Sequence, residues 1–338
     1  MSPAQSAFPA SVAAFCAELG RDPLLVQGAG GNVSWKEGDT LHVKASGTWL
    51  AQAVHDEIFV PVELGPLRAA MASGDYAVAP VVRSEARLKP SIETSLHALL
   101  PQRLVVHLHA VEILTHLVRA DSQETLQQRL PGAVPWAVVE YRKPGAELTQ
   151  AVSKALRQTP DARIVLLRNH GVVLGGGDVA EIRNTLDGLI SALKTEPPPS
   201  AMAAPSAPSP IAGYRAISDA ELADLAMDPT LFDRLAADWA LYPDHVVFLG
   251  ARAPIFASWD ALRQYLEQHA AAPELIFIRD TGVFVRESFG PAKLAQLRCY
   301  YEVVRRQSPA QKLTSLTHEQ VAELLNWDAE KYRINLAK

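Results

Sequence analysis

Continuous apolar runs, separated by stretches of helical spacing, constrain the fold of this chain more than any other feature. Residues 103–111 (RLVVHLHAV) and 162–171 (ARIVLLRNHG) lack the alternation of a half-exposed strand and predict strands covered on both faces. Helical spacing predicts helices at 91–100, 111–119, 148–156 and 179–193. Because strands and helices interleave, the sequence predicts a layered α/β fold, with helices flanking a sheet.

A proline-rich stretch at 196–213 (EPPPSAMAAPSAPSPIAG) divides the chain into two parts. Its six prolines remove amide donors and disfavour both helix and sheet, which predicts an exposed linker. We therefore expect a catalytic domain over residues 1–195 and a smaller α/β extension over residues 214–338.

Two segments of the second part resemble segments of the first part in sequence. Residues 275–285 (LIFIRDTGVFV) align without a gap on 164–174 (IVLLRNHGVVL), and 245–250 (HVVFLG) resemble 104–109 (LVVHLH). The overlay places Phe248, Gly250 and Thr281 at the positions of His107, His109 and His170. A degenerate repeat explains the likeness, and so does the general similarity of buried apolar strands; both interpretations stay open.

Composition excludes several classes of partner. A net charge of −5 and a pI near 6.1 argue against nucleic acid and anionic membranes, which require a dense basic face. Cys16 and Cys299 are too few for a disulfide framework and are expected to be reduced packing residues. The N-terminus lacks the pattern of a signal peptide, and no run approaches the ~18 apolar residues of a membrane span. We therefore expect a cytoplasmic protein.

Three histidines and a glutamate indicate a metal site. His107 and His109 are two residues apart on one predicted strand, so their side chains share a face. Imidazoles are unfavourable in a buried strand unless paired, either with a divalent ion or with carbonyl groups in the core. His170, which ends another apolar run beside the turn-permitting Gly171, favours the ion. Glu93 is a candidate ligand or general base, although such a glutamate is more often a solvated helix charge.

The glycine-rich segment GAGGNVSWK (28–36) predicts a turn whose amides face an anion. It lacks the G-K-[ST] ending of a P-loop and the G-x-G-x-x-G spacing of a dinucleotide site. Glycine clusters are commonly just turns, so this segment alone is weak evidence for binding.

Together these segments resemble the class II aldolase/adducin family. The matching stretches are GGNVS (30–34), KASGT (44–48), PSIETSLH (90–97), VVHLHA (105–110), VEYRKPGAEL (139–148) and RNHGVVLGG (168–176). They follow the family's order at about its spacing. Residues 214–338 resemble the extension after the aldolase domain of long rhamnulose-1-phosphate aldolases. A short-chain dehydrogenase domain often follows there, and we expect it to be absent here.

The resemblance implies roles for individual residues. It makes His107, His109 and His170 the ligands of a divalent ion, Zn²⁺ before Mn²⁺ or Co²⁺. It makes Glu93 the acid/base, and the fourth ligand when substrate is absent. His97 would either contact the metal ligands without binding the ion itself or have a structural role. The positions at which the family binds the substrate phosphate, or their neighbours, are Gly31, Asn32, Ser46, Gly47, Thr48 and Ser91.

Family aldolases also use a tyrosine from a neighbouring subunit to protonate the leaving aldehyde oxygen. Tyr141 is the candidate by its position in the sequence, with Tyr214 and Tyr242 as further candidates. Packing at a strand end is the alternative role of Tyr141. Active sites between subunits further imply a homo-oligomer.

The implied function is a metal-dependent aldolase that cleaves a ketose 1-phosphate to dihydroxyacetone phosphate and an aldehyde. A divalent ion would stabilise the enediolate, and Glu93 would move the proton. The same residues would serve a pentulose-phosphate 4-epimerase or a methylthioribulose-1-phosphate dehydratase. An adducin-like interaction module would have no use for three histidines and a glutamate. A metallohydrolase would not explain the phosphate-type motifs.

Overall fold

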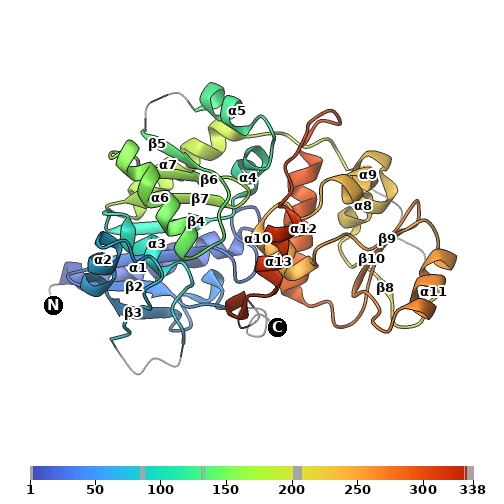
Figure 1. Cartoon of the computed structure of the whole chain (residues 1–338), viewed down its shortest axis with the longest axis horizontal. Coiled ribbons are helices and arrows are strands. Elements are labelled where there is room, and N and C mark those ends of the chain that lie inside the picture. The colour runs from blue at the N-terminus through green and yellow to red at the C-terminus, as the bar shows by residue number, and fades with distance from the viewer. Residues whose placement is uncertain are drawn as a thin grey trace.

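The N-terminal region, residues 3–193, is built on a seven-stranded mixed sheet of order β3-β2-β1-β4-β7-β6-β5 (Figure 1). The computed structural model describes residues 3–83, 88–130, 132, 134–200, 208–330 and 332. Its hydrogen-bonded strands are antiparallel except for the parallel pair β5 and β6. The strands are β1 (Asn32–Glu37), β2 (Thr40–Lys44), β3 (Phe59–Glu63), β4 (Leu104–Leu108), β5 (Trp136–Val139), β6 (Ile164–Leu167) and β7 (Gly171–Gly176).

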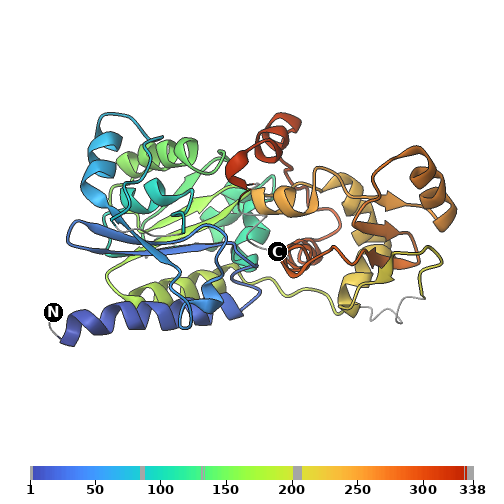
Figure 2. The same ribbon diagram turned by 90° about the horizontal axis from the view of Figure 1, so that it is seen from below.

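Helices cover both faces of this sheet, which confirms the predicted layered α/β fold (Figure 2). Helices α1, α4 and α7 share one core with the sheet, whereas α3 and α6 pack in another on the opposite face. The helices are α1 (Pro3–Arg21), α2 (Leu64–Ala72), α3 (Thr94–Leu99), α4 (Val111–Leu117), α5 (Ser122–Arg129), α6 (Ala146–Gln158) and α7 (Val179–Leu193), with the 3-10 turn η1 (Leu50–Gln52).

The central strands bury both faces, which explains why their sequences do not alternate. In β4, Val106 packs in the core under α1 and α7, while Val105 packs in the core under α3 and α6. Leu166 and Val165 of β6 divide between the same two cores. A strand that contributes to two cores needs an apolar residue at every position.

The C-terminal region, residues 208–332, contains a four-stranded sheet of order β8-β11-β10-β9. Helices α10, α12 and α13 lie between the two sheets (Figure 1). Its elements are β8 (Arg215–Ala216), η2 (Ala220–Ala223), α8 (Asp224–Met227), α9 (Pro229–Ala237), α10 (Pro243–Leu249), β9 (Ile255–Phe256), α11 (Trp259–Gln268), β10 (Leu275–Ile278), β11 (Gly282–Val285), α12 (Pro291–Arg305) and α13 (His318–Leu325).

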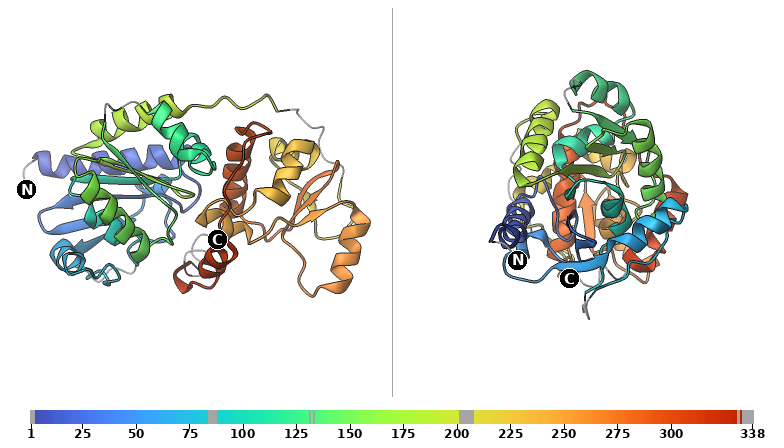
Figure 3. Two further views of the ribbon diagram at one scale, coloured as in Figure 1. Left: turned by 45° about the horizontal axis from the view of Figure 1, so that its top comes forward. Right: turned by 90° about the vertical axis from the view of Figure 1, so that its left-hand side faces the viewer.

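The expected linker begins as a segment without helix or strand after α7 (Figure 3). Residues 201–207 of it lie outside the described part of the chain. Both cysteines are buried free thiols, as predicted for packing residues. No helix in the described ranges combines the length and apolarity needed to cross a membrane.

The overlay of residues 275–285 on 164–174 corresponds to two similar β-hairpins in the structure. β10 and β11 pair antiparallel as β6 and β7 do, and each hairpin gains a parallel neighbour, β9 or β5. Asn169 and Asp280, which are equivalent in the overlay, both have a φ of 53°. The degenerate repeat itself stays a prediction.

The other half of the overlay is wrong. Residues 245–249 lie in helix α10, not in a counterpart of strand β4. The physical reason is Pro243 at the start of the segment: its fixed φ suits the first turn of a helix, and its missing N–H is not needed there. Gly250, with a φ of 89°, then ends the helix.

Candidate metal centre

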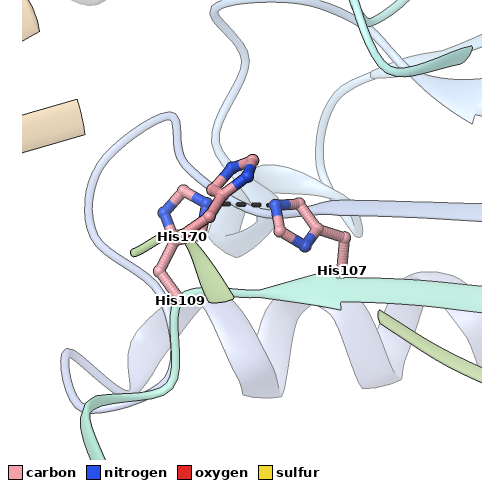
Figure 4. Close-up of side chains that lie close together, drawn as sticks. All are labelled: His107, His109 and His170. Carbon is pink, nitrogen blue, oxygen red and sulfur yellow. Dashed lines mark hydrogen bonds between the residues drawn. The ribbon is translucent and has the colours of Figure 1, made fainter. Parts of the chain in front are cut away.

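The three predicted histidine ligands converge at one end of the central strands (Figure 4). His107 lies in β4, His109 just beyond it, and His170 in the turn between β6 and β7. Because β4 pairs with β7, that turn lies beside the end of β4. One ring nitrogen from each histidine lies within 4.8 Å of the others, and all three residues are buried. Residues far apart in the sequence therefore form one cluster.

The rings of the first two histidines are oriented as a metal site requires. Nδ1 of His107 lies 3.0 Å from the carbonyl oxygen of Val172, to which an Nδ1–H donates. Its Nε2 faces Nε2 of His109 at 3.1 Å (Figure 4). A proton on Nδ1 leaves the lone pair of Nε2 for an ion. Burial lowers the pKa of His107, against the opposing effect of the Glu93 carboxylate, and so favours the neutral ring.

Glu93 is buried beside two of these rings. Its Oε2 lies 3.6 Å from Nε2 of His107, and its Oε1 lies 3.8 Å from Nε2 of His170. The side-chain amide of Asn32 donates to Oε2 at 2.7 Å. Glu93 stands at the N-cap of α3 and is 4% exposed, so the alternative of a solvated helix charge is wrong. Three imidazoles and one carboxylate in a buried cluster fit a divalent ion.

The glycine segment runs beside the end of β4, because β1 pairs with β4 and Asn32 lies opposite His107. Gly31 has a φ of 65°, and a Cβ there would lie 3.1 Å from the carbonyl oxygen of His107. Only glycine allows both this backbone conformation and this approach without strain. Nζ of Lys44 donates to the carbonyl oxygen of Ala29 at 3.1 Å, which holds the segment in place. Asn32, the next residue after Gly31, thereby reaches Glu93.

The other predicted phosphate-binding residues lie in two adjoining segments. The N–H of Ser46 donates to the carbonyl oxygen of Lys89 at 3.0 Å, so the turn with Gly47 (φ 79°) contacts the segment that leads to Ser91. The Ser91 hydroxyl accepts from the N–H of Glu93 at 3.2 Å. Thr48 instead donates its hydroxyl to the carbonyl oxygen of Ala45, a bond that stabilises the turn. The structure thus links Ser91 to Glu93, and the turn at Ser46 and Gly47 to the segment that precedes Ser91.

His97 is fully buried in α3, and its Nδ1 lies 2.8 Å from the hydroxyl of Ser34 on β1. Burial lowers its pKa well below the ordinary value, so the ring is neutral. This hydrogen bond ties α3 to the sheet and agrees with the structural role.

The three candidate tyrosines lie in different surroundings. Tyr141 follows β5, the neighbour of the strand that leads to His170. Its hydroxyl is buried and lacks a hydrogen-bond partner in the described ranges. Burial, with a smaller effect of three glutamates, raises its pKa. Tyr214 donates to the carbonyl oxygen of Pro273 at 2.6 Å, far along the C-terminal region. Tyr242 is buried immediately before α10.

One residue at the cluster was not found by sequence reasoning. Asp244, in the first turn of α10, places Oδ2 3.3 Å from Nδ1 of His109. The Pro-Asp pair at 243–244 is a signal for a helix start. It could have identified the helix, but not the contact with a histidine 135 positions earlier.

The comparisons with known proteins identify the family of the N-terminal region. A family model described as the class II aldolase and adducin N-terminal domain matches residues 10–196, more than half of the chain. A solved structure, the N-terminal class II aldolase domain of a conserved protein from Thermoplasma acidophilum, aligns with a TM-score of 0.45 at 25% identity. That alignment covers 54% of this chain and 90% of the other.

Two curated relatives share parts of the sequence. The uncharacterized oxidoreductase YuxG of Bacillus subtilis (strain 168) is 28% identical over 176 residues, which are 47% of this chain and 25% of that protein. The methylthioribulose-1-phosphate dehydratase of Cronobacter sakazakii is 33% identical over 118 residues, 30% of this chain and 61% of the dehydratase. The matches thus span less than two thirds of either relative. Through residues 10–196, this chain belongs to the class II aldolase and adducin N-terminal domain family.

Proposed function

We propose that this chain is a metal-dependent aldolase, which cleaves a ketose 1-phosphate to dihydroxyacetone phosphate and an aldehyde. The observation that supports it most is the buried carboxylate of Glu93, within 3.8 Å of both His107 and His170. A base held beside a metal centre is what removal or return of a proton next to a carbonyl group requires. An interaction module has no use for this arrangement.

Each residue of the site has a task in this proposal. His107, His109 and His170 would hold the ion, with Zn²⁺ as the first candidate and Mn²⁺ or Co²⁺ as alternatives. When bound, the ion supplies Lewis-acid stabilisation of the negative charge that develops on the carbonyl oxygen. Glu93 moves the proton at the adjacent carbon, and Asn32 holds its carboxylate by the 2.7 Å hydrogen bond. This anchor holds Glu93 beside His107 and His170.

The phosphate group would be bound by the turns around Gly31, Ser46, Gly47 and Ser91, with Thr48 holding its turn. The chain has a net charge of −5, so a phosphate must be held by local amides and hydroxyls and not by a basic face. Tyr141 stays the candidate for the group that exchanges a proton with the aldehyde oxygen: that oxygen loses its proton in cleavage and regains it in the reverse, condensation direction. The raised pKa of Tyr141 keeps its hydroxyl protonated, which is the form that donates in the condensation direction.

A second candidate is dehydration of a ketose 1-phosphate, as the name of the Cronobacter relative suggests. Here Glu93 would remove a proton from the carbon beside the carbonyl group, whereas in aldol cleavage it returns one there, and water would leave instead of an aldehyde. Products distinguish the two reactions: dihydroxyacetone phosphate forms only by carbon–carbon cleavage.

The test is an assay of the Zn²⁺-loaded chain with ketose 1-phosphates, including rhamnulose, fuculose and methylthioribulose 1-phosphates. Glu93→Gln, His107→Ala and Tyr141→Phe are the variants. His42→Ala is the control, since His42 stacks on Trp35 away from the cluster. We expect metal-dependent release of dihydroxyacetone phosphate, abolished in Glu93→Gln and His107→Ala, reduced in Tyr141→Phe and retained in His42→Ala. Loss of water without cleavage would favour the dehydratase, and no reaction of metal-loaded protein would refute both.

A further inference from the structure

The C-terminal region reaches into the metal centre at Asp244. This residue is 2% exposed and lies 3.3 Å, through Oδ2, from Nδ1 of His109. Gln296 of α12 donates its side-chain amide to the same oxygen at 3.3 Å. A buried carboxylate is costly unless charged or polar groups surround it, and here one of those groups is a predicted metal ligand.

The glycine segment leaves room for this contact. A Cβ at Gly30 would lie 3.0 Å from Oδ2 of Asp244 and 3.1 Å from Nδ1 of His109. A larger residue would therefore press on both partners at once. The absence of a side chain at Gly30 allows the glycine segment to pass beside the pair.

The C-terminal region also holds the turn that carries His170. The side-chain amide of Asn169 donates to the carbonyl oxygens of Leu241 at 2.9 Å and Thr314 at 2.6 Å. Asn169 has a φ of 53°, a conformation that asparagine tolerates better than most residues. Two of the three histidines are thus anchored, directly or through a neighbour, by residues after position 240.

We infer that Asp244 is a positioning residue for His109 and that the C-terminal region is an integral part of the metal centre. The Asp244 carboxylate faces Nδ1 of His109 across the 3.3 Å contact, and a proton on Nδ1 would be attracted to it, which favours the tautomer with the lone pair on Nε2. It also fixes the ring plane, with Nε2 turned toward His107 as the 3.1 Å separation shows. A carboxylate behind a metal-bound imidazole makes the ring a stronger ligand. This inference rests on the metal site of the proposed function.

The test measures metal affinity, not activity. Zn²⁺ affinity is determined by competition with a chromophoric chelator, and Co²⁺ absorption reports the coordination of the site. We expect Asp244→Ala to weaken Zn²⁺ binding by about 10- to 100-fold and to change the Co²⁺ spectrum. Asp244→Asn should lose less, because an amide oxygen in the same place can face Nδ1–H without the negative charge.

Asp224→Asn is the matched control. Asp224 is likewise a buried aspartate of the C-terminal region, but its Oδ2 accepts from Tyr301 at 2.8 Å. We expect this variant to bind Zn²⁺ as the wild type does, even where its stability falls. A thermal melt of each metal-free variant shows whether that variant is folded. If Asp244→Ala does not fold, the Zn²⁺ affinity of the isosteric Asp244→Asn variant tests the inference.

Three outcomes are distinct. A graded loss of affinity at position 244 alone supports the inference. Wild-type affinity and an unchanged Co²⁺ spectrum in folded position-244 variants would overturn it, while leaving the proposed function intact. Failure of the wild type itself to bind any of the three ions would overturn both.

Discussion

Gly171→Ala should damage the metal centre mainly through the backbone, without replacing a ligand. Gly171 begins β7, directly after His170. A Cβ there would overlap the carbonyl oxygen of Leu108 and lie 3.1 Å from Cδ2 of His109. The obstructing atoms are mostly backbone, so they cannot move aside by a change of rotamer.

The expected magnitude follows from this overlap. To restore normal contact, β7 must move from the end of β4 by about 1 Å, a distortion comparable to overpacking a core, which costs ~1–3 kcal/mol. Metal–nitrogen distances tolerate only about 0.2 Å. We therefore expect Gly171→Ala to lose about 2 kcal/mol of stability and to bind Zn²⁺ at least ~10-fold more weakly.

Urea unfolding of the metal-free chain and chelator competition measure the two effects separately. Gly188→Ala is the control, because Gly188 lies in α7 with no atom within 4 Å of the added Cβ. That change should stabilise the chain by up to about 1 kcal/mol and leave Zn²⁺ affinity unchanged. If Gly171→Ala matched the wild type in both measurements, the steric argument would be refuted.

Three further predictions concern the rest of the fold. Burial raises the pKa of Cys299 to about 12 and also raises that of Cys16, so neither should react with thiol reagents at pH 8 until the chain unfolds. Rapid labelling of the native chain would contradict this. Burial lowers the pKa of His245 to about 3, so protons bind the unfolded state first and stability falls as pH drops below ~6.5. His245→Phe should remove ~1.4 kcal/mol per pH unit of that slope in urea titrations between pH 6 and 4; an unchanged slope would exclude this assignment. Arg306→Leu removes the cation that pairs with two buried carboxylates, and it should lower the free energy of unfolding in urea by ~3 kcal/mol. Arg163→Leu, at an exposed ion pair, should lower it by less than ~1 kcal/mol. Equal losses of stability in the two variants would show that the burial of an ion pair does not decide its contribution to stability.

The layered sheet and its histidines could be predicted because their signals are local. An apolar run without alternation identifies a strand buried on both faces, and β4 and β6 are such strands. His107 and His170 stand in or after these runs, so strand pairing alone brings them together. The burial of Glu93 could not be read from its own helical neighbourhood. The hydrogen bond that holds the buried carboxylate comes from Asn32, 61 residues earlier in the sequence.

Asp244 shows why the rest could not be predicted. The segment 245–250 is as apolar as a buried strand, and its helical state is decided by Pro243 and by packing against α12 and α13. The contact of Asp244 with His109 depends on how two regions pack, for which no periodicity gives a signal. The role of Tyr141 stays a prediction, since the structure shows a hydroxyl buried in the core and the sequence gives only the residue's position along the chain.

The most direct test of the central claim is hydrogen exchange of dihydroxyacetone phosphate in D₂O, followed by proton NMR. It isolates the proton transfer assigned to Glu93 and requires no knowledge of the aldehyde. We predict that the Zn²⁺-loaded chain exchanges a hydrogen on the hydroxymethyl carbon. Exchange should stop on removal of the ion and in Glu93→Gln. Absence of exchange from protein with a stoichiometric bound ion would contradict the aldolase proposal.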